Sequence, residues 1–114
     1  MSTTWEKFQG ATLSLARSGS IKERLSDAYR NHLSAVAEEE LPREIREQFH
    51  YVRCSLTRER PQRGEDAIRA SVRKLSSHEA ENIAETVVQM LSVMARSPQA
   101  TRPATAVPLY LLEA

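Results

Sequence analysis

Apolar residues recur at intervals of three and four along positions 4–95, which is the spacing that places side chains on one face of an α-helix. Five segments show this pattern, at 4–17, 20–36, 42–58, 65–75 and 76–95. Between the glycines and prolines that separate them, most residues are good helix formers. The residues expected to face a common core are Trp5, Phe8, Thr12, Leu15, Leu25, Tyr29, Leu33, Val36, Ile45, Phe49, Val52, Leu56, Ile68, Val72, Leu75, Ala80, Ile83, Val87, Met90, Leu91 and Met94, with Ala84, Val88 and Ala95 widening the last stripe.

The segment boundaries carry residues that start and stop helices. Ser20 and Ser76 are each followed three residues later by Glu, the pattern of a capping box, in which each side chain accepts from the other residue's backbone amide. Gly19 supplies the left-handed residue that ends the first helix, and Arg17 complements the dipole of its last turn. Gly10 weakens that helix by about 1 kcal/mol relative to Ala. We expect Gly10 to allow close approach of a neighbouring helix.

Helices joined by short linkers pack as antiparallel hairpins. The first two helices are separated only by residues around Gly19, and the fourth and fifth by a turn at Ser76. The fifth segment is the most apolar, so we expect it at the centre. The sequence therefore predicts an all-α fold, a small bundle of four to five helices built as two hairpins. Residues 1–96 form this domain.

Residues 97–114 differ in composition from the rest of the chain. They are rich in Pro, Ala and Thr and predict a flexible or extended C-terminal tail. The tail ends in an apolar cluster, Leu109, Tyr110, Leu111 and Leu112. We interpret this cluster as a docking peptide for another protein, or as a segment that covers an apolar groove of its own bundle or of a second subunit. We favour docking of this cluster within its own chain or between subunits.

Composition narrows the class of protein without naming a partner. Sixteen basic and fifteen acidic side chains nearly cancel, so net charge alone does not favour nucleic acid or a membrane. No apolar run approaches the roughly 20 residues that span a bilayer. A single cysteine, Cys54, excludes an internal disulfide, and no secretory signal is recognisable at the N-terminus. We expect a cytoplasmic protein of bacterial-like composition.

Motifs for metal, nucleotide or thiol chemistry are weak or missing. The three histidines occur in no metal-binding motif, and the glycines are too scattered for a phosphate-binding loop, so we expect no cofactor and no metal. His32 and His50 lie on different predicted helices and are read as ordinary imidazoles. His50 lies four residues before Cys54, a spacing compatible with thiol activation. We favour a packing role for Cys54, as a small filler beside Val52 and Leu56.

The most informative feature is a basic stretch between Arg53 and Lys74. It carries seven basic and three acidic residues, which leaves it at +4, while the rest of the chain, with nine basic and twelve acidic residues, is at −3. Such a stretch is a candidate surface for phosphates or an acidic partner. The candidate contact residues are Arg58, Arg60, Arg63, Arg69, Arg73 and Lys74.

Internal pairing is the favoured alternative for these cations. Glu65 precedes Arg69 by four residues, the favourable order for an ion pair on a helix, and the acidic fifth helix is available to neutralise the others. A helix-turn-helix is rejected because the would-be recognition helix begins with Glu79, Glu81 and Glu85, which phosphates would repel.

Three functions remain after these exclusions. The first is a non-enzymatic interaction or regulatory protein, which binds another protein or itself through a helical face or the C-terminal peptide. The second is non-specific binding of nucleic acid or another polyanion through segment 53–74. The third is a small-ligand or thiol-dependent activity in a pocket between helices, with only Cys54 and His50 to support it. Because no catalytic motif is found, the chain is not expected to be an enzyme.

Overall fold

The computed structural model describes residues 3–96, which fold as five α-helices with two short helical turns between the second and third. The elements are α1 (Thr4–Leu15), α2 (Ile21–Ala28), a π-helical turn η1 (Tyr29–Leu33), a 3₁₀ turn η2 (Glu38–Glu40), α3 (Arg43–Thr57), α4 (Ala67–Lys74) and α5 (Ser77–Arg96). The predicted all-α fold is confirmed. Within residues 3–96, no helix is both long enough and apolar enough to cross a membrane. The predicted tail residues 97–114, including the cluster Leu109–Leu112, lie outside the described part of the chain.

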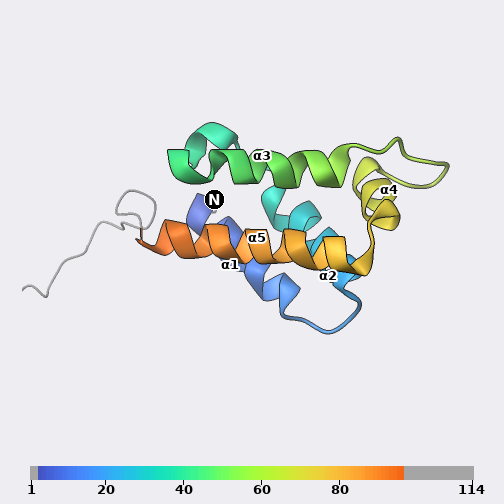
Figure 1. Ribbon diagram of the computed structural model, residues 1–114, viewed down its shortest axis with the longest axis horizontal. Helices are drawn as coiled ribbons and strands as arrows, with labels where there is room; N and C mark the ends of the chain where they lie inside the picture. Colours follow the sequence, from blue (N-terminus) through green and yellow to red (C-terminus); the bar gives the residue numbers. More distant parts are fainter. Residues whose placement is uncertain (1–2, 97–114) are drawn as a thin grey trace, which may run out of the picture.

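The fifth helix is central, as its apolar stripe predicts. It packs against α1, α2 and α3, while α1 also packs on α2, and α3 on α4 (Figure 1). Ile83, Val87, Met90 and Met94 on α5 are at most 1% exposed. The stripe is narrower than expected on one side, because Val88 is 40% exposed. Ala95 is exposed as well.

The core residues of the other helices follow the predicted stripes closely. Phe8 of α1 and Phe49 of α3 are fully buried, and their ring centroids lie 6.0 Å apart in a tilted arrangement. Leu25, Tyr29, Leu33 and Val36 are buried, as are Ile45, Val52, Leu56, Val72 and Leu75. Trp5, Ile68 and Leu91 are only partly buried and pack at the edge of the core. Thr12 is also partly buried, and its hydroxyl donates to the Phe8 carbonyl oxygen at 3.0 Å.

The second helix does not continue regularly to Val36. It widens into a π-helical turn over Tyr29–Leu33, in which the Ser34 amide donates to the Tyr29 carbonyl oxygen at 2.9 Å. Apolar residues spaced by four drift by about 40° per step around a regular α-helix. One wider turn corrects this drift, so Leu25, Tyr29 and Leu33 all remain directed into the core. Periodicity located the buried residues, but it did not reveal the change of helix type.

The helix ends confirm most of the predicted caps. Ser76 and Glu79 form the complete capping box, with bonds of 3.0 Å and 2.8 Å in the two directions. Ser20 accepts from the Glu23 amide at 3.1 Å, but the Glu23 carboxylate returns no bond to the Ser20 amide. Gly19 has the expected positive φ of 113°. Arg17 was wrongly placed in the last turn of the first helix, because that helix ends at Leu15.

A different arginine, Arg24, satisfies the end of the first helix. Its Nη1 donates to the Leu15 carbonyl oxygen at 2.7 Å and its Nε to the Gly19 carbonyl oxygen at 3.1 Å. This side chain comes from the following helix, so it supplies the cation at the C-terminal end of α1 and also ties the α1–α2 hairpin together. The start of α1 is held by a capping box between Thr3 and Glu6 that the sequence reading missed.

Candidate functional site

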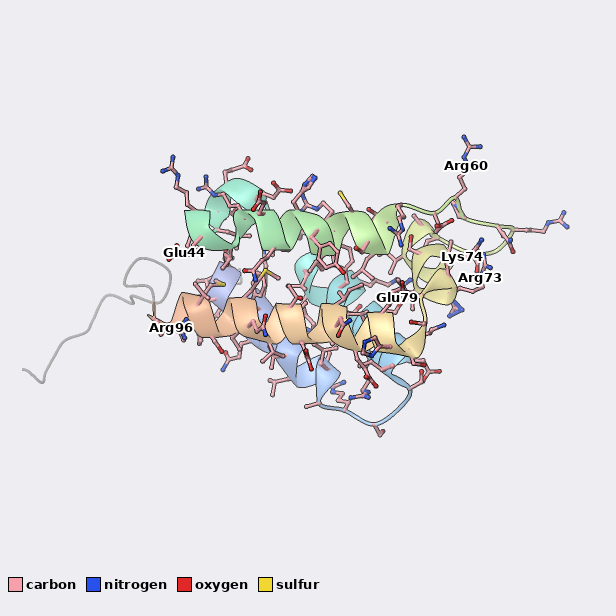
Figure 2. All side chains as sticks on the ribbon, viewed as in Figure 1. Glu44, Arg60, Arg73, Lys74, Glu79 and Arg96 are labelled. Atoms are coloured by element: carbon pink, nitrogen blue, oxygen red, sulfur yellow. The ribbon has the colours of Figure 1, made fainter. Side chains whose placement is uncertain are left out.

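The fold collects the predicted basic residues at one end of the molecule. The loop 58–66 and the short helix α4 form this end, and Figure 2 shows Arg60, Arg73 and Lys74 there, with Glu44 and Arg96 at the opposite end. All six candidate contact residues have exposed side chains. We call this surface the basic end. It is defined by Arg58, Arg60, Arg63, Arg69, Arg73 and Lys74.

The local structure of α4 is determined by its N-terminal cap. Asp66 lies at the N-cap position and accepts from the Arg69 amide at 2.8 Å, so the helix begins at Ala67. The predicted start at residue 65 was therefore wrong by two positions. Asp66 also receives two bonds from Arg30 Nη2, at 2.8 Å and 2.9 Å, which fasten the start of α4 to the π-helical turn. These bonds hold the pKa of Asp66 below its ordinary value, with the Arg69 amide as the largest cause.

Internal pairing neutralises only part of the basic end. Glu65 pairs with Arg73 through bonds of 2.8 Å and 3.2 Å, which lower the pKa of Glu65 and raise that of Arg73. The predicted pair of Glu65 with Arg69 is wrong, because Glu65 lies before the helix and helical i, i+4 geometry does not apply to it. Arg58 makes only a long contact of 3.9 Å with Glu59.

The remaining four cations of the basic end lack a carboxylate partner. Among residues 3–96, no Asp or Glu oxygen lies within ion-pair distance of Arg60, Arg63, Arg69 or Lys74. The expectation that the fifth helix neutralises them is also wrong for the part of the chain described. Glu79 on α5 uses its carboxylate to cap its own helix through the Ser76 amide, which lowers its pKa. The basic end therefore presents cations whose charge is available to a ligand.

Acidic residues lie at both ends of the molecule. Glu65 and Asp66 belong to the loop of the basic end, and Figure 2 shows Glu79 near Arg73 and Lys74. Glu39 and Glu40 are exposed in the 3₁₀ turn, and Glu44 and Glu47 are exposed along the start of α3. Glu40 accepts from the Thr4 hydroxyl at 3.0 Å. Arg43 and Arg46 lie among these carboxylates, so both ends carry mixed charge, and the basic end is distinguished by the cations there that lack a carboxylate partner among the described residues.

A cleft of about 420 Å³ runs between α2 and α4 at this same end. Arg69 and Arg73 line it from α4, and Lys22 and Arg30 line it from the opposite wall. Sequence analysis did not include Lys22 or Arg30 in the site. Both residues are 36 or more positions away from α4 in the sequence, so no local pattern connects them with it. Only the packing of α2 on α4 brings them to the cleft.

Cys54 and His50 lie beside each other on α3. The Cys54 Sγ lies 3.4 Å from His50 Nε2, and His50 Nδ1 lies 3.0 Å from a Glu38 carboxylate oxygen. The predicted packing role of Cys54 is wrong, because its thiol is exposed on the outer side of α3. Cys54 and His50 line neither the α2–α4 cleft nor the clefts at Glu39–Arg46 and between α1, α2 and α5. A thiol-dependent activity thus gains a contact, but none of these three clefts includes the thiol.

His32 lies apart from this group and packs against Gly10 of α1. In the stretch from Thr3 to Arg96, no group of three or more His, Cys, Asp or Glu side chains is placed to hold a metal ion. No known family model matches the chain, and neither a curated protein nor a solved structure is significantly similar to it.

Proposed function

We propose that this chain is a non-enzymatic binding protein whose basic end binds the phosphate backbone of nucleic acid without reading its sequence. The observation that carries the proposal is that Arg60, Arg63, Arg69 and Lys74 are exposed at one end and have no carboxylate partner among the described residues. Cations that neutralise phosphates release condensed counterions, and this supplies most of the free energy of non-specific binding.

The shape of the basic end suits backbone contact better than base readout. The loop 58–66 carries Arg60 and Arg63 on an exposed connection, and α4 is only eight residues long. A recognition helix in a major groove needs base-contacting side chains along its first turns. The following helix, α5, begins with Glu79 and Glu81 exposed, which would face phosphates unfavourably. Contacts to phosphates position a protein on nucleic acid but carry no direct sequence information.

This proposal keeps the hypothesis of an interaction protein and specifies that its partner is anionic. Binding of another protein through the C-terminal cluster Leu109–Leu112 stays a prediction, because those residues lie outside the described chain. A cytoplasmic location and a bacterial origin also stay predictions from composition.

Fluorescence anisotropy of a labelled random duplex tests the proposal with two charge-matched variants. The first replaces Arg60, Arg63 and Lys74 with Gln, and removes three charges from the basic end. The second replaces Arg17, Arg43 and Arg96 with Gln, and removes three charges from exposed positions elsewhere. We expect the first variant to bind at least tenfold more weakly than the second at low salt. Equal loss in both variants would show that only net charge matters, and no binding by the unmodified protein would refute the proposal.

A further inference from the structure

The cleft between α2 and α4 differs from the rest of the basic end, because cations converge on it from two separate elements. Its volume of about 420 Å³ falls within the usual range of small-ligand pockets. Lys22 and Arg30 line it from the α2 side, and Arg69 and Arg73 from α4. The side chain of Val72 forms part of the wall between them.

Two of the four cations are already engaged by carboxylates outside the cleft. Arg73 is held by Glu65, and Arg30 by Asp66. Arg69 has no such partner in the described chain, and the Lys22 ammonium donates only to the Arg73 carbonyl oxygen, at 3.3 Å. The cleft therefore contains the charges of Arg69 and Lys22 without a directly bonded counter-ion.

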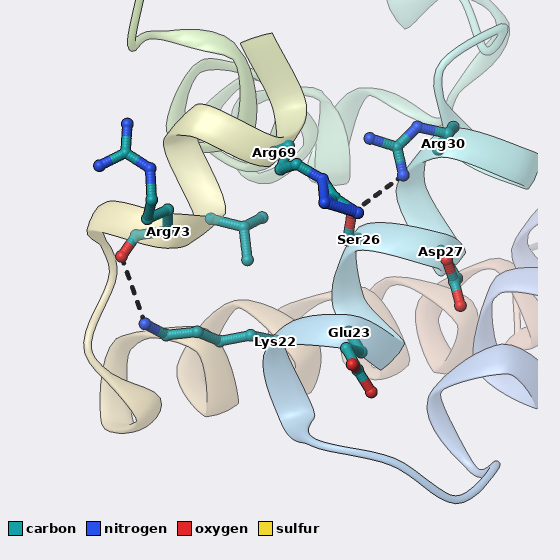
Figure 3. Close-up of a pocket in the computed structure, with 8 residues that line it drawn as sticks. Lys22, Glu23, Ser26, Asp27, Arg30, Arg69 and Arg73 are labelled. Carbon is teal, nitrogen blue, oxygen red and sulfur yellow. Dashed lines mark hydrogen bonds between the residues drawn. The ribbon is translucent and has the colours of Figure 1, made fainter. Parts of the chain in front are cut away.

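The side chain of Arg69 reaches across the cleft. Figure 3 shows it extending from α4 toward Ser26 and Arg30 on the opposite wall, where the Arg30 Nη1 donates to the Ser26 hydroxyl at 3.1 Å. The Arg30 guanidinium is already paired with Asp66, so Arg69 supplies the charge at this place that has no carboxylate partner among the described residues. Forked guanidinium donors and a nearby hydroxyl are the groups that bind a phosphate oxygen set.

Two carboxylates limit what kind of anion fits. Glu23 and Asp27 also line the cleft, one turn apart on α2, and Figure 3 shows both directed away from Arg69. A continuous phosphodiester chain passing through the cleft would run close to these carboxylates. A terminal phosphate that enters from the α4 side would meet Arg69 first, whereas the Lys22 ammonium is directed at the Arg73 carbonyl oxygen (Figure 3).

We infer that the α2–α4 cleft binds one terminal phosphate group, a phosphomonoester, through Arg69 together with Arg30 and the Ser26 hydroxyl. The inference rests on the proposed function, because the cleft belongs to the basic end, and it names the group bound there. The phosphate has two sources of the same chemistry, the phosphorylated end of a nucleic-acid strand and a free phosphorylated small molecule such as a mononucleotide.

The test is a titration of the ¹⁵N-labelled full chain with adenosine 5′-monophosphate or with adenosine, at constant ionic strength, followed by the amide signals of α2 and α4. We expect saturable shifts at Ser26 and Arg69 with the monophosphate and none with adenosine. Arg69→Gln should weaken binding about tenfold or more, because it removes a charge-assisted bond. Arg17→Gln, an exposed variant outside both the cleft and the basic end, should leave it unchanged.

Shifts that occur equally with adenosine, that appear only outside α2 and α4, or that persist in Arg69→Gln would overturn the inference. A third titration with a 5′-phosphorylated oligonucleotide and its unphosphorylated counterpart identifies the source. Tighter binding of the phosphorylated strand than of its unphosphorylated counterpart indicates a strand end, and equal binding of the two strands, with the mononucleotide still bound, indicates a small molecule. Because a mononucleotide is not a polyelectrolyte, this result is independent of duplex binding, and either proposal can fail without the other.

Discussion

Gly10 shows how one missing side chain determines where a neighbouring segment lies. A Cβ at this position would lie 2.6 Å from His32 Nδ1 and 2.7 Å from Cε1, both closer than van der Waals contact allows. The His32 ring packs against α1 in the space that Gly10 leaves. The close approach predicted from the sequence is thus confirmed, and the partner is a side chain of the π-helical turn rather than a regular helix.

Gly10→Ala and His32→Ala, made singly and together, test this contact. Ala is a better helix former than Gly by about 1 kcal/mol, so Gly10→Ala alone would stabilise α1 if nothing opposed it. We expect the clash with His32 to cancel or reverse this gain, and we expect the gain to return when His32 is also Ala. Urea unfolding of the four proteins gives the coupling free energy. A stabilisation by Gly10→Ala that is the same with and without His32 would contradict the account.

At the scale of elements, α4 is stabilised by its N-terminal cap and by its packing on neighbouring helices. Its eight residues are too few to be stable alone, so its cap and its packing carry it. Asp66 serves both purposes, because it accepts from the Arg69 amide and pairs with Arg30 of the π-helical turn. Asp66 therefore helps to orient α4, and with it the basic end, together with the packing of α4 on α3 and α2.

Substitutions of Asp66 separate its cap from its charge. Asn is as good an N-cap as Asp, so Asp66→Asn keeps the cap and weakens the Arg30 pair, whereas Asp66→Ala loses both and should cost about 1 kcal/mol at pH 7. The folded-state pKa values of Glu65, Asp66 and Glu79 are lowered. Their stabilising contribution is therefore present above the unfolded pKa values near 4 and is lost as pH falls through the folded values.

Thermal unfolding between about pH 5 and pH 2 measures this contribution. We expect the melting temperature of Asp66→Asn to fall less steeply over this range than that of the unmodified protein, since one titrating group is gone. The difference should be small, because the Asp66 side chain is 53% exposed and its pair with Arg30 is screened by water. Identical pH profiles for the two proteins would show that Asp66 contributes no charge-dependent stability.

The sequence predicted the elements well wherever a single local pattern was sufficient. The stripes identified most of the large buried side chains but missed Leu41 and the small residues Ala11, Ala28 and Ala70, and the Ser76–Glu79 box located the start of α5. Val88 was misplaced because a stripe has no sharp edge, and only packing decides which flanking residue stays exposed. The α2–α4 cleft was missed for a different reason, since Lys22 and Arg30 join Arg69 only through the tertiary contact of their helices.

At the scale of the whole molecule, the central feature is the group of cations at the basic end. The sequence located the basic stretch but favoured its neutralisation by Glu65 and by α5. In the structure, Glu65 pairs with Arg73, and Glu79 caps the start of its own helix. Within residues 3–96, no carboxylate therefore pairs with the other cations of the basic end, Arg60, Arg63, Arg69 and Lys74. This arrangement favours an anionic partner over the unspecified protein partner that the sequence placed first.

The dependence of duplex affinity on salt concentration tests this claim most directly. Each phosphate neutralised contributes about −0.9 to the slope of log K against log salt, so four free cations predict a slope of about −3 to −4. The variant with Gln at positions 60, 63 and 74 should retain a slope of about −1. A slope near zero for the unmodified protein, or an unchanged slope in that variant, would contradict the account and show that the basic end does not bind phosphates.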